Sequence, residues 1–113
     1  MSEWTAEDDK IVTLARSARA RVQAPSAAAL RDTQGRTYAS ASVDVPPLKL
    51  TAIELVVGQA IASGADGIEA VVLCDSASIS TDDMAVIQGF AGSGVPVYHV
   101  DLTGDLRETQ LSE

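Results

Sequence analysis

The segment that most constrains the fold of this chain is LKLTAIELVVGQAIA, residues 48–62, which follows Pro46-Pro47 and precedes Ser63-Gly64. Its apolar spacing predicts a helix from Leu48 to Ala62 with apolar residues on nearly every side. The polar exceptions are Lys49, Thr51, Glu54 and Gln59. A helix that is apolar all round is buried, often partly by another subunit, so other elements must surround this one.

Two apolar runs predict buried strands on either side of a further helix. The runs are IEAVVLC at residues 68–74 and VPVYHV at residues 95–100. Between them, Ser80-Thr81-Asp82-Asp83 is a capping-box variant that opens a helix through about Phe90. A strand–helix–strand unit crosses over with right-handed chirality, which places the two strands in parallel.

The N-terminal part predicts a helix followed by a β-hairpin. Thr5 and the carboxylates after it are typical of a helix start, and Pro25 ends the pattern, which gives a helix at about residues 5–22. Segments 27–31 and 36–43 flank a turn that starts at Asp32 and ends at Gly35, and they form the hairpin. The alanines of this hairpin are poor strand formers, so we expect other elements to pack very close to them.

The whole order is helix, hairpin, helix, strand, helix, strand, helix in a single domain of residues 1–113. One or two final helical turns are expected from Thr103 to Leu111, and Trp4 is expected to anchor the first helix or a subunit contact. The predicted fold class is α/β, with a mixed sheet between helices on both faces in a three-layer α-β-α arrangement.

Composition excludes several classes of protein. One cysteine and one histidine cannot form a disulfide framework or the common Cys/His zinc sites. Sixteen acidic against eight basic side chains argue against a nucleic-acid partner. No apolar run approaches the ~20 residues that span a membrane. The polar start MSEWTAEDDK does not resemble a signal peptide, so the expected location is the cytoplasm.

Other candidate catalytic residues have simpler structural interpretations. His99 lies within a predicted strand and Cys74 ends one, so both are expected to be buried structural residues. No G-x-S-x-G elbow supports a serine hydrolase. The glycine-rich segment 89–94 follows a helix instead of opening one, which favours a helix end over a phosphate loop. Asp75 follows a strand and is expected in a loop.

The element order, together with PSAAALRDTQGRTYASASVDV at residues 25–45, resembles the small zinc-dependent cytidine deaminases. In that family a strand carries N-V-E, the central helix begins C-A-E-R, and the next helix begins P-C-G-A-C. The corresponding stretches here are SAAAL at residues 26–30, GRTY at 35–38, SVD at 42–44 and AIASG at 60–64. Family members are commonly tetramers with the central helix near the middle. The resemblance implies a homo-oligomer, a dimer or tetramer, that associates through the helix from Leu50 to Ala62.

The chemical motifs differ from those of the family. Zinc deaminases activate a water on a Cys₃ or His/Cys/Cys zinc site, and a glutamate that is not a ligand moves the protons. The resemblance places the three ligand positions on Thr51, Ser80 and Asp83, the catalytic glutamate position on Ile53, and the arginine after it on Glu54. Shifting the register to make Glu54 the proton shuttle would put Ala52 at the ligand position and rotate the helix by ~100°. No catalytic residue, metal site or cofactor is therefore predicted.

The resemblance also implies a vestigial nucleoside pocket at Ser42, Asp44, Thr51 and Glu54, because Ser42 and Asp44 align with the asparagine and glutamate of N-V-E. The connection from Asp44 to Thr51 is two residues shorter than in the family. The first hypothesis is a non-catalytic, zinc-free relative with a structural, regulatory or weak nucleoside-binding role. The alternative is a hydrolase of nucleosides or related small molecules that uses altered pocket residues, namely Asp44, Thr51, Glu54 or Asp75.

Overall fold

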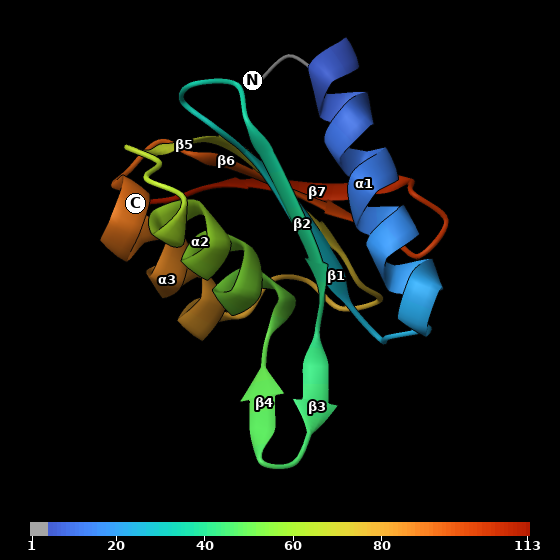
Figure 1. The fold of residues 1–113 in the computed structure, drawn as a ribbon. Helices are drawn as coiled ribbons and strands as arrows, with labels where there is room; N and C mark the ends of the chain where they lie inside the picture. Colours follow the sequence, from blue (N-terminus) through green and yellow to red (C-terminus); the bar gives the residue numbers. More distant parts are fainter. Residues whose placement is uncertain (1–4) are drawn as a thin grey trace.

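The sheet of this protein has five strands and lies between helices on both faces (Figure 1). The computed structural model describes residues 5–113, so the expectation for Trp4 lies outside the described residues. Helix α1 (Ala6–Val22) covers one face, and α2 (Ala52–Ala62) and α3 (Thr81–Ala91) cover the other. The predicted α/β class and three-layer arrangement are confirmed.

The strand order is β2-β1-β5-β6-β7. The strands are β1 (Ala27–Asp32), β2 (Thr37–Ala41), β5 (Ile68–Cys74), β6 (Pro96–Val100) and β7 (Leu106–Leu111). Strands β5 and β6 pair in parallel and are linked through α3, as predicted, whereas the other neighbouring strands pair antiparallel. The sheet is therefore mixed, and its central strands are covered on both faces.

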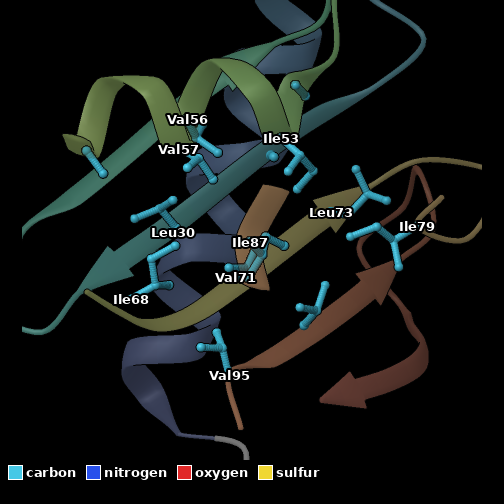
Figure 2. Close-up of a cluster of buried hydrophobic side chains, with 14 residues drawn as sticks. Leu30, Ile53, Val56, Val57, Ile68, Val71, Leu73, Ile79, Ile87 and Val95 are labelled. Carbon is cyan, nitrogen blue, oxygen red and sulfur yellow. The ribbon is translucent and has the colours of Figure 1, made fainter. Parts of the chain in front are cut away.

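Two apolar clusters share the sheet between them because successive side chains of a strand point to opposite faces. Ala28 and Leu30 face α2 and α3, while Ala29 faces α1. Figure 2 shows the α2 and α3 cluster, in which Ile53 and Ile87 meet the strand side chains. Residues 27–29 are completely buried, which confirms the expectation that other elements pack close to the hairpin alanines.

The predicted hairpin turn is present and is held by a buried carboxylate. The Gly35 amide donates to the Asp32 carbonyl oxygen at 3.0 Å, and Gly35 has a positive φ that suits glycine. Burial alone would raise the pKa of Asp32, but hydrogen bonds from the Tyr38 hydroxyl and from the Arg36 and Gln34 amides outweigh it and lower that pKa.

The predicted helix from Leu48 to Ala62 is wrong in its first turn. Strand β4 (Leu48–Leu50) pairs antiparallel with β3 (Val43–Val45), and the two form an arm outside the main sheet (Figure 1). The helix begins only after Thr51, whose extended backbone and capping side chain stop the strand. Its burial is also one-sided: Ile61 is 52% exposed, and the buried residues are Ala52, Ile53, Val56, Val57 and Ala60.

The final helical turns predicted from Thr103 to Leu111 are also wrong. Residues 106–111 form β7, an edge strand that pairs antiparallel with β6. The Asp101 carboxylate accepts hydrogen bonds from the amides of Thr103 and Asp105, which folds the chain back on itself. Pairing with the open edge of β6 then gives the segment a ladder of hydrogen bonds that a short isolated helix lacks.

Within residues 5–113, none of the helices has the length and apolar character needed to cross a lipid bilayer.

Candidate functional site

A pocket of about 520 Å³ lies where the β3–β4 arm meets the starts of α2 and α3 and the end of β5. We call it the arm pocket. Its polar lining consists of Ser26, Ser42, Asp44, Lys49, Thr51, Asp75, Ser78, Ser80 and Asp83. Among the described residues, three carboxylates and five hydroxyls thus accompany a single lysine in the lining. This volume falls in the range of small-molecule sites.

Thr51 lies beside Ser80 and Asp83 although 32 positions separate it from Asp83 in the sequence. The Thr51 hydroxyl donates to Asp83 Oδ1 at 2.9 Å and accepts from the Glu54 amide at 3.0 Å. The Ser80 hydroxyl accepts from the Asp83 amide at 3.1 Å. The Thr51 and Asp83 side chains are therefore bonded to each other, and the Thr51 and Ser80 hydroxyls cap the first turns of α2 and α3.

The Asp83 carboxylate has an unusual position for a residue three places into a helix. It does not close the capping box that the sequence predicted, because its oxygen accepts the Thr51 hydroxyl instead of the amide of the cap residue. Burial raises the pKa of Asp83 above its usual range, and the hydrogen bond from Thr51 opposes that shift only in part. Nearby Glu54 adds to the increase through charge repulsion.

Ile53 and Glu54, the next two candidate positions on α2, do not line the arm pocket. Ile53 is completely buried in the cluster between the sheet and the helices (Figure 2). Glu54 lies outside the pocket lining, and its carboxylate accepts from the Thr51 amide at 2.8 Å. The burial of Ile53 supports the unshifted register, since a rotation of ~100° would turn this face away from the core.

Ser42 and Asp44, the other predicted pocket residues, lie on the opposite wall. The Ser42 amide donates to the Ser26 carbonyl oxygen at 2.9 Å, and Asp44 on β3 is in register with Lys49 on β4. Three of the four predicted nucleoside-pocket residues thus share one cavity, and Glu54 does not line it.

Asp75, which the hydrolase alternative names, lines the pocket, and the structure adds Ser78 and Lys49 to it. Asp75 lines the pocket while its carboxylate accepts from the Ala77 amide at 2.9 Å, and Ser78 lies beside it. Lys49 was predicted to be helical, so its place at the mouth of a pocket was missed. Position is the signal that could have found Ser78, because it follows Asp75 at the carboxyl end of a parallel strand, where α/β sheets bind ligands.

The lone histidine and cysteine do not contribute to the pocket. His99 is nearly buried, and its Nε2 lies 2.7 Å from the Asp75 carbonyl oxygen, which confirms a satisfied structural histidine. Cys74 is a buried free thiol, and burial raises its pKa, as expected of an unreactive cysteine. In residues 5–113 no three His, Cys, Asp or Glu side chains form a group that could hold a metal ion.

The cytidine deaminase-like family model matches residues 4–104. The chain belongs to the cytidine deaminase-like family. No curated protein sequence matches it. Solved cytidine deaminases share the fold: the enzyme from Burkholderia pseudomallei has a TM-score of 0.81 at 18% identity, covering 96% of this chain and 94% of its own. The Mycobacterium leprae cytidine deaminase has a TM-score of 0.73 at 20% identity, covering 92% of each chain.

Proposed function

We propose that this protein is a non-catalytic, zinc-free member of the cytidine deaminase-like family whose arm pocket binds a neutral, hydroxylated small molecule of the nucleoside type. The observation that carries the proposal is the set of hydrogen bonds that joins Thr51, Ser80 and Asp83. Family resemblance assigns these three positions to zinc ligands. In this protein the Thr51 and Ser80 hydroxyls cap helices, and the bond from Thr51 to Asp83 links α2 to α3.

The donor chemistry at these positions does not fit a zinc ion. Zinc in proteins is held mainly by thiolates and imidazoles, and two neutral hydroxyls with one carboxylate are a weak set. The Thr51 and Ser80 hydroxyls also each accept a backbone amide already, which leaves one lone pair of a neutral, weakly basic oxygen for a metal. Ile53, at the position of the catalytic glutamate, carries no group that could move a proton. No deamination step is therefore assigned to these residues.

The arm pocket has a composition suited to a sugar. Ser42 and Asp44, which align with the family motif that holds ribose hydroxyls, face the same cavity as Thr51. Carboxylates accept hydrogen bonds from sugar hydroxyl groups, and Ser and Thr hydroxyls both donate to them and accept from them. Three carboxylates beside one lysine repel a phosphate. We therefore propose a nucleoside ligand and exclude a nucleotide from this pocket.

The alternative function is hydrolysis of a nucleoside or a related small molecule. Asp83 favours it because burial raises its pKa, while Asp75 and Asp44 line the same pocket. Two carboxyl groups in different environments can act as general acid and general base. Product analysis distinguishes the two functions, since hydrolysis releases free base or sugar from the nucleoside and simple binding leaves it intact.

A homo-oligomer is part of the proposal. Helix α2 presents Ile61, which is 52% exposed, on the side that faces away from the sheet, and the arm presents Val45 and Leu48. Covering these side chains with a second copy would remove apolar surface from water. Size-exclusion chromatography with light scattering should find a dimer or tetramer, and a strict monomer would remove this part of the proposal.

Zinc content tests the central claim. Elemental analysis of the purified protein should find no stoichiometric zinc, whereas the Thr51→Cys/Ser80→Cys/Asp83→Cys variant should bind about one zinc ion per chain. The matched control is Thr51→Cys/Thr81→Cys/Asp82→Cys, which moves two thiols to exposed neighbouring positions and should bind much less. Stoichiometric zinc in the unmodified protein would overturn the proposal.

Ligand binding tests the second half of the claim. Titration calorimetry should detect cytidine or uridine, and Asp44→Ala should weaken binding about tenfold, as expected when a charged hydrogen-bond partner is lost. Asp82→Ala, an exposed residue outside the pocket, is the control and should leave the affinity unchanged. Equal affinity in the Asp44→Ala variant would exclude this pocket as the nucleoside site.

A further inference from the structure

A second pocket, of about 300 Å³, lies on the α1 face of the sheet, away from α2 and α3. It is lined by Thr13, Arg16, Ser17, Arg19 and Ala20 of α1 and by Leu102, which follows β6. Figure 1 shows α1 beside the loop that joins β6 to β7. We propose that this α1 pocket binds the phosphate group of a small molecule.

The first observation is that two arginines in the pocket have no carboxylate partner among the residues that the structure describes. Arg31 forms ion pairs with Asp8 and Glu69, and Arg36 forms one with Asp32. By contrast, no carboxylate within residues 5–113 lies within 4.0 Å of the Arg16 or Arg19 side chain. The chain has twice as many acidic as basic side chains, so acidic partners are not scarce. These two guanidinium groups are available to an external anion.

The second observation concerns Arg19. Its Nε is buried and has no hydrogen-bond partner among the described residues. Cations near the end of a helix are favoured by the helix dipole, which accounts for the exposed Arg21. The dipole does not account for a buried N–H without an acceptor, since such groups are rare and costly in proteins. A small rotation of the Arg19 side chain would let this N–H donate to an anion in the α1 pocket, which would supply the missing acceptor.

The third observation concerns Arg16, whose side chain lies against Gly104. A Cβ placed on Gly104 would come within 2.9 Å of Arg16 Cδ and 3.3 Å of its Nε. Gly104 also has a φ of +95°, which favours glycine. Both the backbone conformation and the close approach of Arg16 therefore require a residue without a side chain at this position. The turn thus holds the Arg16 stem at the mouth of the pocket, which reduces the entropy that a ligand must overcome.

The identity of the donors selects the ligand class. Arginine presents planar donors that match phosphate and carboxylate oxygens, and hydrogen bonds between charged groups are the strong ones. Thr13 already donates to the Asp9 carbonyl oxygen at 3.1 Å, which leaves the Ser17 hydroxyl as the neutral donor. A pocket of this volume is at the small end of ligand sites, which favours one phosphate group with a short carbon skeleton.

Acidic residues on the adjacent turn are the main opposition to an anion. The Asp101 carboxylate accepts hydrogen bonds from the amide and the hydroxyl of Thr103. Its Oδ2 also lies 3.7 Å from Arg107 Nη1, so its negative charge is partly balanced. These interactions lower the pKa of Asp101, with the Thr103 hydroxyl as the largest contributor. Asp101 therefore stays ionised at neutral pH, and it limits the site to modest affinity without neutralising Arg16 and Arg19.

Titration calorimetry at low salt, with inorganic phosphate and with glycerol 3-phosphate, tests the proposal. Both phosphates should bind, and Arg16→Gln and Arg19→Gln should each weaken binding at least about tenfold. Tighter binding of the ester would indicate a phosphorylated metabolite, and equal binding would indicate phosphate alone. Binding should also weaken as salt is added, because exposed charges are screened.

Arg21→Gln is the matched control, because Arg21 is exposed on the same helix and does not line the pocket. It should change the affinity less than about twofold, and all three variants should unfold at similar temperatures. The proposal is overturned if neither phosphate binds, or if Arg21→Gln weakens binding as much as Arg16→Gln and Arg19→Gln do.

Discussion

Helices α1 and α3 begin with the same sequence pattern, a hydroxyl residue followed three positions later by an aspartate, yet the two aspartates have different partners. Asp8 closes a capping box by accepting the Thr5 amide at 3.0 Å, and its second oxygen lies 3.2 Å from Arg31 Nη2. Asp83 leaves its box open and accepts the Thr51 hydroxyl at 2.9 Å. The capping residues determine where each helix starts, whereas neighbouring elements in the folded protein determine the hydrogen-bond partner of the aspartate.

The electrostatic consequence follows from those neighbours. Asp8 is only 2% exposed, but a cation shares its burial. Asp83 faces a neutral hydroxyl, and burial raises its pKa. A buried charge needs a partner of opposite sign, and a hydroxyl replaces only part of the lost hydration. The buried ion pair therefore stabilises the start of α1, whereas the start of α3 holds a pocket-lining carboxyl group whose pKa is raised by burial.

The largest difference between the two helix starts should appear on removal of the carboxylates. Asp8→Ala should lower the free energy of unfolding by about 3 kcal/mol, because it leaves the Arg31 guanidinium buried with one partner fewer. Glu69 still pairs with Arg31 but is more exposed, so it compensates only in part. Urea unfolding followed by circular dichroism measures the change.

Asp83→Ala is the control for Asp8→Ala. It should cost about 1 kcal/mol or less, since it removes one hydrogen bond to a neutral group. Equal losses in the two variants would contradict the comparison, because Asp83 would then have to stabilise the fold as strongly as a buried ion pair.

The hydroxyl that links α2 to α3 should have the next largest effect. Thr51→Ala removes both the cap of α2 and the bond to Asp83, so it should cost about 2 kcal/mol, against about 1 kcal/mol for Ser80→Ala, which removes a cap alone. Thr51→Ser keeps the hydroxyl and should recover most of the loss. The same urea measurements apply, and equal costs for the two alanine variants would mean that the interhelical bond contributes nothing.

The fold was largely predictable because the strongest signals were local and repeated. The apolar run of β5 and the capping residues Thr5 and Ser80 placed their elements correctly. The two segments predicted wrongly are those in which a neighbouring strand determines the secondary structure. Leu48–Leu50 is apolar enough for either a helix or a strand, and only β3 beside it selects the strand. Residues 106–111 became β7 because β6 offered an open edge, which a reading of the segment alone cannot detect.

The candidate site was predictable only as a set of positions. The resemblance brought Ser42, Asp44 and Thr51 to one region, and the structure places all three on the arm pocket. The bond from Thr51 to Asp83 was not predictable, because the sequence pattern at Ser80 favours a closed capping box. Such a bond spans 32 positions in the chain and depends on how α2 and α3 approach each other.

The smallest expected effect is a pH dependence at Asp83. Asparagine has an oxygen that can keep the Thr51 hydrogen bond but no charge, so Asp83→Asn isolates ionisation. Burial raises the pKa of Asp83 in the folded protein above its usual value near 3.8. The wild-type protein therefore loses stability relative to Asp83→Asn as the pH rises through the raised, folded-state pKa. Below pH 3.8 the two proteins should be alike, and at neutral pH the variant should be more stable, by less than about 1 kcal/mol because the group is partly exposed to solvent. A wild-type protein that gains stability relative to Asp83→Asn with rising pH would contradict this prediction and would indicate a cation beside Asp83.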